Sequence, residues 1–142
     1  MTELVREVFV EATPEVIFQY LVDAKKYEEW SGSKADLDPR PGGIHRAVMG
    51  GSHLSEGEFL EIDQDSRVLF SFGWAEPDHP IPPGSTTVEI ALLPDERGTT
   101  VRLIHRGLPE NAVGDHSLGW DHYLARLKVV VTGGEPGPDE MG

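Results

Sequence analysis

The chain has 142 residues, with 25 acidic and 12 basic side chains, no cysteine and a formal net charge of −13. This length suits one domain with one core, and the absence of thiols excludes disulfides and thiolate metal sites. Lysine and arginine are scattered, so the basic patch of a nucleic-acid-binding protein is missing. No apolar run approaches the ~20 residues that span a bilayer, and the N-terminus lacks a signal-peptide pattern, so we expect a cytoplasmic protein without membrane insertion.

The first part of the chain predicts a strand and two short helices. Residues Leu4–Glu11 alternate and are rich in β-branched side chains, which favours a strand. Thr13 and Pro14 then provide a helix N-cap and a first-turn proline. Apolar residues follow at helical spacing: Val16, Ile17, Tyr20 and Leu21. A second helical turn is expected at Tyr27–Trp30, and two prolines and two glycines in Asp38–Gly43 then change the chain direction.

From residue 44 onward the pattern has a period of two. It predicts five further strands: Ile44–Met49, Leu54–Ile62, Arg67–Trp74, Thr86–Leu93 and Thr99–His105. The connections between them are Gly50-Gly51, Gln64-Asp65, the proline-rich loop Ala75–Gly84 and Asp95–Gly98. Because most of these connections are short, we expect an antiparallel meander of about six strands in total.

The last element is a helix over Gly114–Val131. Its apolar and aromatic positions share one face: His116, Trp120, Tyr123, Leu124, Leu127, Val130 and Val131. We interpret residues 1–132 as a single domain and residues 133–142 as a disordered tail, because the tail has almost nothing apolar to bury. The fold class is therefore α+β, with one long helix available to cover a curved sheet.

The strand patterns place several apolar side chains on one face of this sheet. Alternation puts these residues together: Val68, Phe70, Phe72 and Trp74 on one strand, Val88, Ile90 and Leu92 on the next, and Val101, Leu103 and His105 on the third. His105 therefore lies on an otherwise apolar face, close to the aromatic end of the last helix. A bent sheet can stand away from its covering helix, so the space between them is either core or pocket.

Several ordered motifs resemble a known family. They are Pro14–Leu21, Tyr27–Trp30, Asp38–Gly43, Glu58–Asp63, Gly98–Leu103 and His116–Leu124. Together, over about residues 4 to 131, they resemble the START-like (SRPBCC) superfamily, and within it the branch of proteins similar to the activator of heat-shock protein 90 ATPase. Each motif is weak alone, and the order of the set makes it specific.

The resemblance implies the helix-grip fold, in which a bent antiparallel sheet wraps around a long C-terminal helix and two short helices follow the first strand. It also implies a pocket that holds apolar or amphipathic small molecules in many relatives, among them lipid carriers, polyketide cyclases and aromatases. The chaperone-activating role belongs to members that carry a further domain, so we give it less weight here.

We predict that the protein binds a hydrophobic or aromatic small molecule without turning it over. The candidate ligand-binding residues are Arg46, Phe70, Phe72, Trp74, Ile90, Leu103, His105, His116, Trp120 and Tyr123. Arg46 is expected to pair either with a ligand carboxylate or with a surface acid. No ligand spacing for a metal occurs, and no cofactor is predicted.

Two other functions stay open. A polyketide cyclase or aromatase would use His105, Tyr123 and His116 for acid–base chemistry, with His105 as the base. The alternative for His105 is a buried histidine with ordinary hydrogen-bond partners, which we favour. A protein-interaction or chaperone-associated module would instead have a filled core, and a homodimer is compatible with each of these functions.

Overall fold

The computed structural model describes residues 2–31, 34–49 and 53–136. In chain order the elements are β1 (Thr2–Val10), α1 (Pro14–Val22), α2 (Ala24–Ser31), β2 (Lys34–Leu37), β3 (Ile44–Met49), β4 (His53–Asp63), β5 (Arg67–Phe72), β6 (Thr86–Pro94), β7 (Thr99–Leu108), the 3-10 turn η1 (Glu110–Ala112) and α3 (Val113–Val131). The predicted Gly50-Gly51 connection lies outside the described residues, as do residues 137–142 of the predicted tail.

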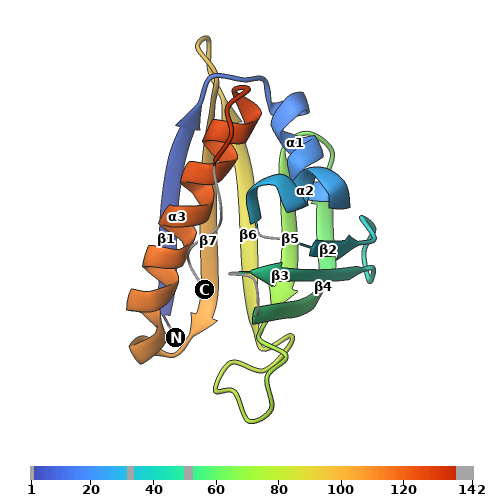
Figure 1. The fold of residues 1–142 in the computed structure, drawn as a ribbon, viewed down its shortest axis with the longest axis vertical. Coiled ribbons are helices and arrows are strands. Elements are labelled where there is room, and N and C mark those ends of the chain that lie inside the picture. The colour runs from blue at the N-terminus through green and yellow to red at the C-terminus, as the bar shows by residue number, and fades with distance from the viewer. Residues whose placement is uncertain (1, 32–33, 50–52, 137–142) are drawn as a thin grey trace.

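The strands form one antiparallel sheet of seven strands in the order β1-β7-β6-β5-β4-β3-β2. Helix α3 runs along one face of this sheet, and β2 and β3 cross the view while β1, β7 and β6 run along it, which shows how strongly the sheet bends (Figure 1). The predicted α+β helix-grip fold is therefore confirmed. Strand β2 was not predicted, because Lys34–Leu37 is only four residues long and buries Ala35 alone.

The predicted inward faces of β5, β6 and β7 are also confirmed, except that β5 ends at Phe72, so that Trp74 follows the strand and is half-buried. The inward side chains of β5, β6 and β7 are at most 3% exposed: Val68, Phe70, Phe72, Val88, Ile90, Leu92, Val101, Leu103 and His105. Because side chains alternate along a strand, a register error of one residue would have exchanged this set with the outer face. The hydrophobic effect therefore fixes which face of the sheet meets α3.

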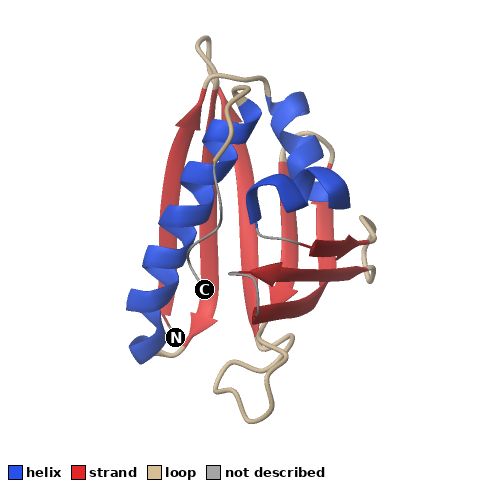
Figure 2. Ribbon diagram, in the orientation of Figure 1, coloured by secondary structure: helices blue, strands red, loops and turns tan. Residues whose placement is uncertain are grey.

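One end of the space between sheet and helix is closed by α1 and α2, which lie beside the C-terminal half of α3 on the same side of the sheet (Figure 2). We call this the closed end and define it by the buried residues Ile17, Leu21, Trp30, Leu124 and Leu127. The indole Nε1 of Trp30 donates to the carbonyl of Tyr20 at 2.9 Å, and Arg126 Nε donates to the carbonyl of Trp30 at 3.0 Å. Through its side chain and its carbonyl, Trp30 therefore links all three helices.

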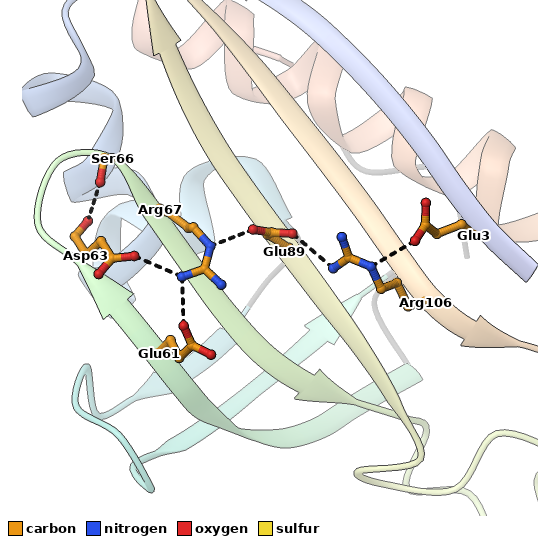
Figure 3. Close-up of polar contacts among 7 residues, drawn as sticks. All are labelled: Glu3, Glu61, Asp63, Ser66, Arg67, Glu89 and Arg106. Carbon is orange, nitrogen blue, oxygen red and sulfur yellow. Dashed lines mark hydrogen bonds and ion pairs between the residues drawn. The ribbon is translucent and has the colours of Figure 1, made fainter.

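The opposite face of the sheet is polar and carries a line of ion pairs across five strands, from β4 to Glu3 on β1 (Figure 3). Arg67 pairs with Glu61, Asp63 and Glu89, and Glu89 also pairs with Arg106 at 2.9 Å. The hydrogen bond from Arg67 is the main reason why the pKa of Glu89 is lowered. Exposed pairs contribute ~0–1 kcal/mol each, so this network organises the outer face rather than driving folding.

Candidate functional site: a pocket at the N-terminal end of α3

A pocket of about 490 Å³ lies between the sheet and the N-terminal half of α3. It is lined by Met49, His53, Phe72, Trp74, Glu76, His79, Asp115, His116, Leu118, Gly119, Trp120 and Tyr123. These residues come from β3, β4, β5, the loop that follows β5, and α3. The pocket therefore lies toward the end of the molecule opposite to α1 and α2 (Figure 1).

The floor of the pocket consists of Met49, Phe72, Trp120 and Tyr123, each at most 5% exposed. Phe72 lies at the centre of this floor, with its ring 5.1 Å from that of Trp74 and 5.9 Å from that of Trp120. Edge-on and tilted contacts of this kind are favourable for aromatic pairs and hold the rings in place. The pocket therefore has a fixed floor formed mostly by aromatic rings.

Trp74 forms a side wall, and the backbone around it is held on both sides. Its amide donates to the carbonyl of Ile81 at 2.8 Å, which returns the proline-rich loop to the sheet. Ile81 itself is only 1% exposed. A Cβ on Gly73 would lie 1.8 Å from the carbonyl oxygen of Pro82, so only glycine allows the loop to pack this closely. The loop is thus anchored by a buried side chain and a close backbone contact.

His105 lies beneath the floor and is not among the residues that line the pocket. Trp120 Nε1 donates to His105 Nδ1 at 3.0 Å, and Thr86 Oγ1 donates to the carbonyl of Phe72 at 2.8 Å. The hydroxyl of Thr86 has therefore used its proton, so His105 Nε2 donates to it at 2.8 Å. Burial lowers the pKa of His105 to about 3, with a smaller contribution from His116. This imidazole is neutral and has both nitrogens occupied.

His116 does line the pocket, and both of its nitrogens also have partners. Its Nδ1 lies 2.9 Å from the carbonyl of Ala112, and its Nε2 accepts from Trp74 Nε1 at 3.2 Å. Since the carbonyl can only accept, Nδ1 carries the proton of the neutral ring. Burial lowers the pKa of His116, so the neutral form that makes both bonds is favoured. His116 thus ties the Trp74 wall to α3.

The outer part of the pocket is polar, and we call it the mouth: His53, Glu76, His79, Asp115 and Leu118. Glu76, Asp115 and Leu118 are exposed, and the two histidines are half-buried. His53 Nδ1 lies 2.7 Å from a carboxylate oxygen of Glu76, and His79 Nδ1 accepts from the Ile81 amide at 2.9 Å. Lysine and arginine are missing from the lining of the described pocket.

Five of the ten predicted ligand-binding residues line this pocket, and they are Phe72, Trp74, His116, Trp120 and Tyr123. Phe70, Ile90 and Leu103 share the inward face but lie deeper, where the sheet meets packed side chains. Phe70, for example, is stacked against His45 with 3.7 Å between ring centroids. Alternation identifies the inward face of a strand, but it does not say how far along the strand the pocket extends.

Arg46 lies on the other face of β3. It shares that face with Ile44 and Val48, whereas His45, Ala47 and Met49 point inward. Its Nε lies 3.1 Å from a carboxylate oxygen of Glu56. Of the two partners predicted for Arg46, the structure therefore contains the surface acid.

The other lining residues were missed by sequence reasoning: Met49, His53, Glu76, His79, Asp115, Leu118 and Gly119. Glu76 and His79 belong to the proline-rich loop, whose unusual length was a usable signal. Met49 and His53 end β3 and begin β4, and only their pairing reveals that they lie together. Two of the missed residues on α3, Asp115 and Gly119, are not hydrophobic, so hydrophobic periodicity could not identify them.

Other kinds of site lack support in the described part of the chain. Its histidine and carboxylate side chains form no cluster of three or more that could hold a metal ion. Likewise, none of its helices combines the length and apolar character needed to cross a bilayer.

The chain is similar to several solved structures. An AHSA1-like protein from Rhizobium etli shares 38% identity, with 97% of this chain and 86% of that chain covered and a TM-score of 0.76. The Aha1 dimer from Colwellia psychrerythraea shares 19% identity over 94% of this chain and 98% of that one, with a TM-score of 0.80. DynU16, a putative protein of the dynemicin biosynthetic locus, shares 19% identity over 97% of this chain and 50% of that one, with a TM-score of 0.83.

Similarity at 19% identity supports the fold only, whereas the Rhizobium etli protein is a closer relative over nearly the whole chain. A search of curated proteins found no match. The model of the Activator of Hsp90 ATPase homolog 1-like protein family matches residues 11–132, which extend from the end of β1 to the end of α3. The family match, the Rhizobium etli relative and the seven-stranded sheet around α3 agree, and the chain belongs to the Activator of Hsp90 ATPase homolog 1-like protein family.

Proposed function

We propose that this protein binds a hydrophobic or aromatic small molecule in the pocket between the sheet and the N-terminal half of α3, without turning it over. The observation that carries this proposal is the pocket of about 490 Å³ with its floor of Met49, Phe72, Trp120 and Tyr123. Ligand pockets typically measure ~300–1,000 Å³ and combine apolar walls with a few polar groups. The likeness to DynU16, a putative protein of a biosynthetic locus, is compatible with a ligand of this kind.

The contacts of the histidines argue against acid–base catalysis. A general base must reach the substrate and hold an available lone pair. His105 is covered by the pocket floor and its Nδ1 lone pair accepts from Trp120, while the Nε2 lone pair of His116 accepts from Trp74. Proton transfer through either ring would first break one of these bonds. The proposed role of both histidines is therefore to position the indoles that line the pocket.

The pocket also argues against a purely protein-binding module, which would have a filled core. A homodimer remains compatible with ligand binding, and the Aha1 dimer from Colwellia psychrerythraea has the same fold. Sedimentation of the purified protein, with and without ligand, would measure its oligomeric state separately from binding.

Gly119 offers the sharpest test of the proposal. It lines the pocket, and a Cβ built on it meets nothing within 4 Å, so a large side chain there would extend into free space. Gly114, on the same helix, has equally free surroundings but is not part of the lining. Gly119→Leu should therefore block the pocket, and Gly114→Leu is its matched control.

The experiment is a thermal-shift screen of the wild type against lipids, polyketides and flavonoids, followed by both variants. A ligand held at 100 times its Kd should stabilise the fold by ~2.7 kcal/mol, which raises the Tm by roughly 5–10 °C. The shift should disappear in Gly119→Leu and persist in Gly114→Leu. An equal shift in both variants would place the ligand elsewhere, and consumption of the ligand over time would show that the protein is an enzyme.

A further inference from the structure

The pocket is asymmetric in charge. Its mouth contains two carboxylates, Glu76 and Asp115, while its lining contains neither lysine nor arginine. The floor beneath is apolar and mostly aromatic, so an amphipathic ligand would place its apolar body on the floor and its polar end at the mouth. That polar end would therefore meet negative charge before any fixed positive charge.

The partial positive charge of the pocket is too small to reverse this preference. The N-terminus of α3 has the equivalent of about half a positive charge, and Asp115 in the first turn already opposes it. His53 contacts Glu76 and offsets its charge only when the imidazole is protonated. The described lining therefore contains no side chain with a permanent positive charge.

The rest of the molecule acts in the same direction. The formal net charge is −13. Arginines on the outer face are paired with acids, as Arg67, Arg102 and Arg106 show. A field of this sign raises the local concentration of cations near the surface and repels anions. The long-range field and the local carboxylates therefore favour the same ligand charge.

We propose that the pocket selects its ligand by charge: it takes an apolar, flat body that ends in a protonated amine, and it rejects the carboxylate of the same shape. The ammonium group would lie between Glu76 and Asp115, next to the Trp74 ring, whose face also attracts cations. This inference rests on the proposed function, since it specifies the chemical class of the ligand for the same pocket.

Three probes of one shape test the inference: naphthylethylamine, naphthylethanol and naphthylacetate. Their dissociation constants are measured by titration calorimetry at pH 8 and low salt. We expect the amine to bind at least about tenfold more tightly than the carboxylate, a difference of about 1.4 kcal/mol, with the alcohol between them. High salt should reduce this ratio, because it screens charges at an exposed mouth.

Two double variants separate the mouth from the net charge. Glu76→Gln with Asp115→Asn removes both carboxylates of the mouth, while Glu11→Gln with Glu96→Gln makes the same change in charge at exposed positions near the opposite end. The ratio should fall at least threefold in the first variant and stay close to the wild-type value in the second. An equal fall in both would assign the preference to net charge alone and overturn the role of the mouth.

The result can also contradict the inference without touching the proposed function. If the alcohol binds and the carboxylate binds as tightly as the amine, the pocket accepts ligands without regard to charge. If none of the three probes binds, the pocket does not take flat bodies of this kind and this inference fails, while the thermal-shift screen with its Gly119→Leu variant still decides the proposed function.

Discussion

The two halves of α3 face the same sheet, but the C-terminal half packs into the core and the N-terminal half lines a pocket. At the closed end, α3 packs against α1 and α2, and Leu124 and Leu127 are at most 2% exposed. At the other end, His116, Trp120 and Tyr123 face a pocket of about 490 Å³. The difference shows that one helix can combine a stabilising core and the wall of a pocket when short helices cover only part of the sheet.

The largest expected effect is a loss of stability in acid, because a neutral histidine is buried toward each end of the space between sheet and helix. Burial lowers the pKa of His45, on the side of the closed end, and of His105, beneath the pocket floor, to about 3 in each case. The unfolded chain binds these protons near pH 6.5, so it holds more protons than the folded state between pH 6.5 and 3. Stability must therefore fall as the pH falls through this range.

The size of this effect follows from the slope of ~1.4 kcal/mol per pH unit for each group. Between pH 7 and pH 4.5 the two histidines should together remove about 5 kcal/mol from the free energy of unfolding. Glu89 contributes only at lower pH, because the hydrogen bond from Arg67 lowers its pKa below the usual carboxylate range. Urea unfolding at a series of pH values measures the slope, and a flat profile from pH 7 to 5 would contradict the assignment of both rings as neutral.

A second prediction compares one leucine from each end of α3. Leu127 is fully buried at the closed end, whereas Leu118 is 65% exposed at the mouth. Leu127→Ala should lower the free energy of unfolding by ~3–5 kcal/mol, because it removes apolar contacts and leaves a void. Leu118→Ala should change stability by less than ~0.5 kcal/mol and act on ligand affinity instead. Similar losses of stability from both would show that the mouth is packed like the core.

These two ends also differ in how well the sequence describes them. The apolar face of β5, β6 and β7 could be predicted, because burial imposes a period of two that even His105 follows. The pocket could be predicted only in part, since Met49 and His53 meet through the pairing of β3 and β4 and Glu76 comes from a loop. Residues that leave space, such as Gly119, produce no hydrophobic signal. Arg46 shows a further limit: it was predicted as a candidate ligand-binding residue, but it lies on the outer face of β3, and its partner Glu56 is revealed only by strand pairing.

The third prediction makes the same substitution at the two buried histidines and expects opposite signs. His105 accepts from Trp120 Nε1 and is bonded to Thr86, so His105→Phe leaves a buried indole N–H without an acceptor and should cost ~2–4 kcal/mol. His45 Nε2 has no hydrogen-bond partner among the described residues, and its ring already stacks on Phe70. His45→Phe should therefore raise the free energy of unfolding by ~1 kcal/mol at pH 7. Because it removes one of the two buried histidines, His45→Phe should also halve the dependence of the free energy of unfolding on pH in acid.

The measurement is urea unfolding of both variants at pH 7 and pH 5, with the ligand shift recorded in parallel. Destabilisation by His45→Phe at pH 7 would mean that its ring is held by a contact other than stacking. A neutral effect of His105→Phe would mean that the bond to Trp120 contributes nothing to stability, and the proposed positioning role of His105 would be lost.

The smallest expected effect concerns Gly119, where a stabilising substitution should also weaken ligand binding. In a helix interior, glycine is less favourable than alanine by ~1 kcal/mol, and nothing lies within 4 Å of the Cβ that alanine would add. Gly119→Ala should therefore raise the free energy of unfolding by about 1 kcal/mol. The gain should come with weaker ligand binding, because the added methyl group occupies part of the pocket. At the closed end a stabilising substitution should have no such consequence, since the proposed site lies at the other end of α3. If Gly119→Ala stabilises the fold and leaves ligand affinity unchanged, the ligand does not contact this part of α3, and the glycine is then not explained by binding.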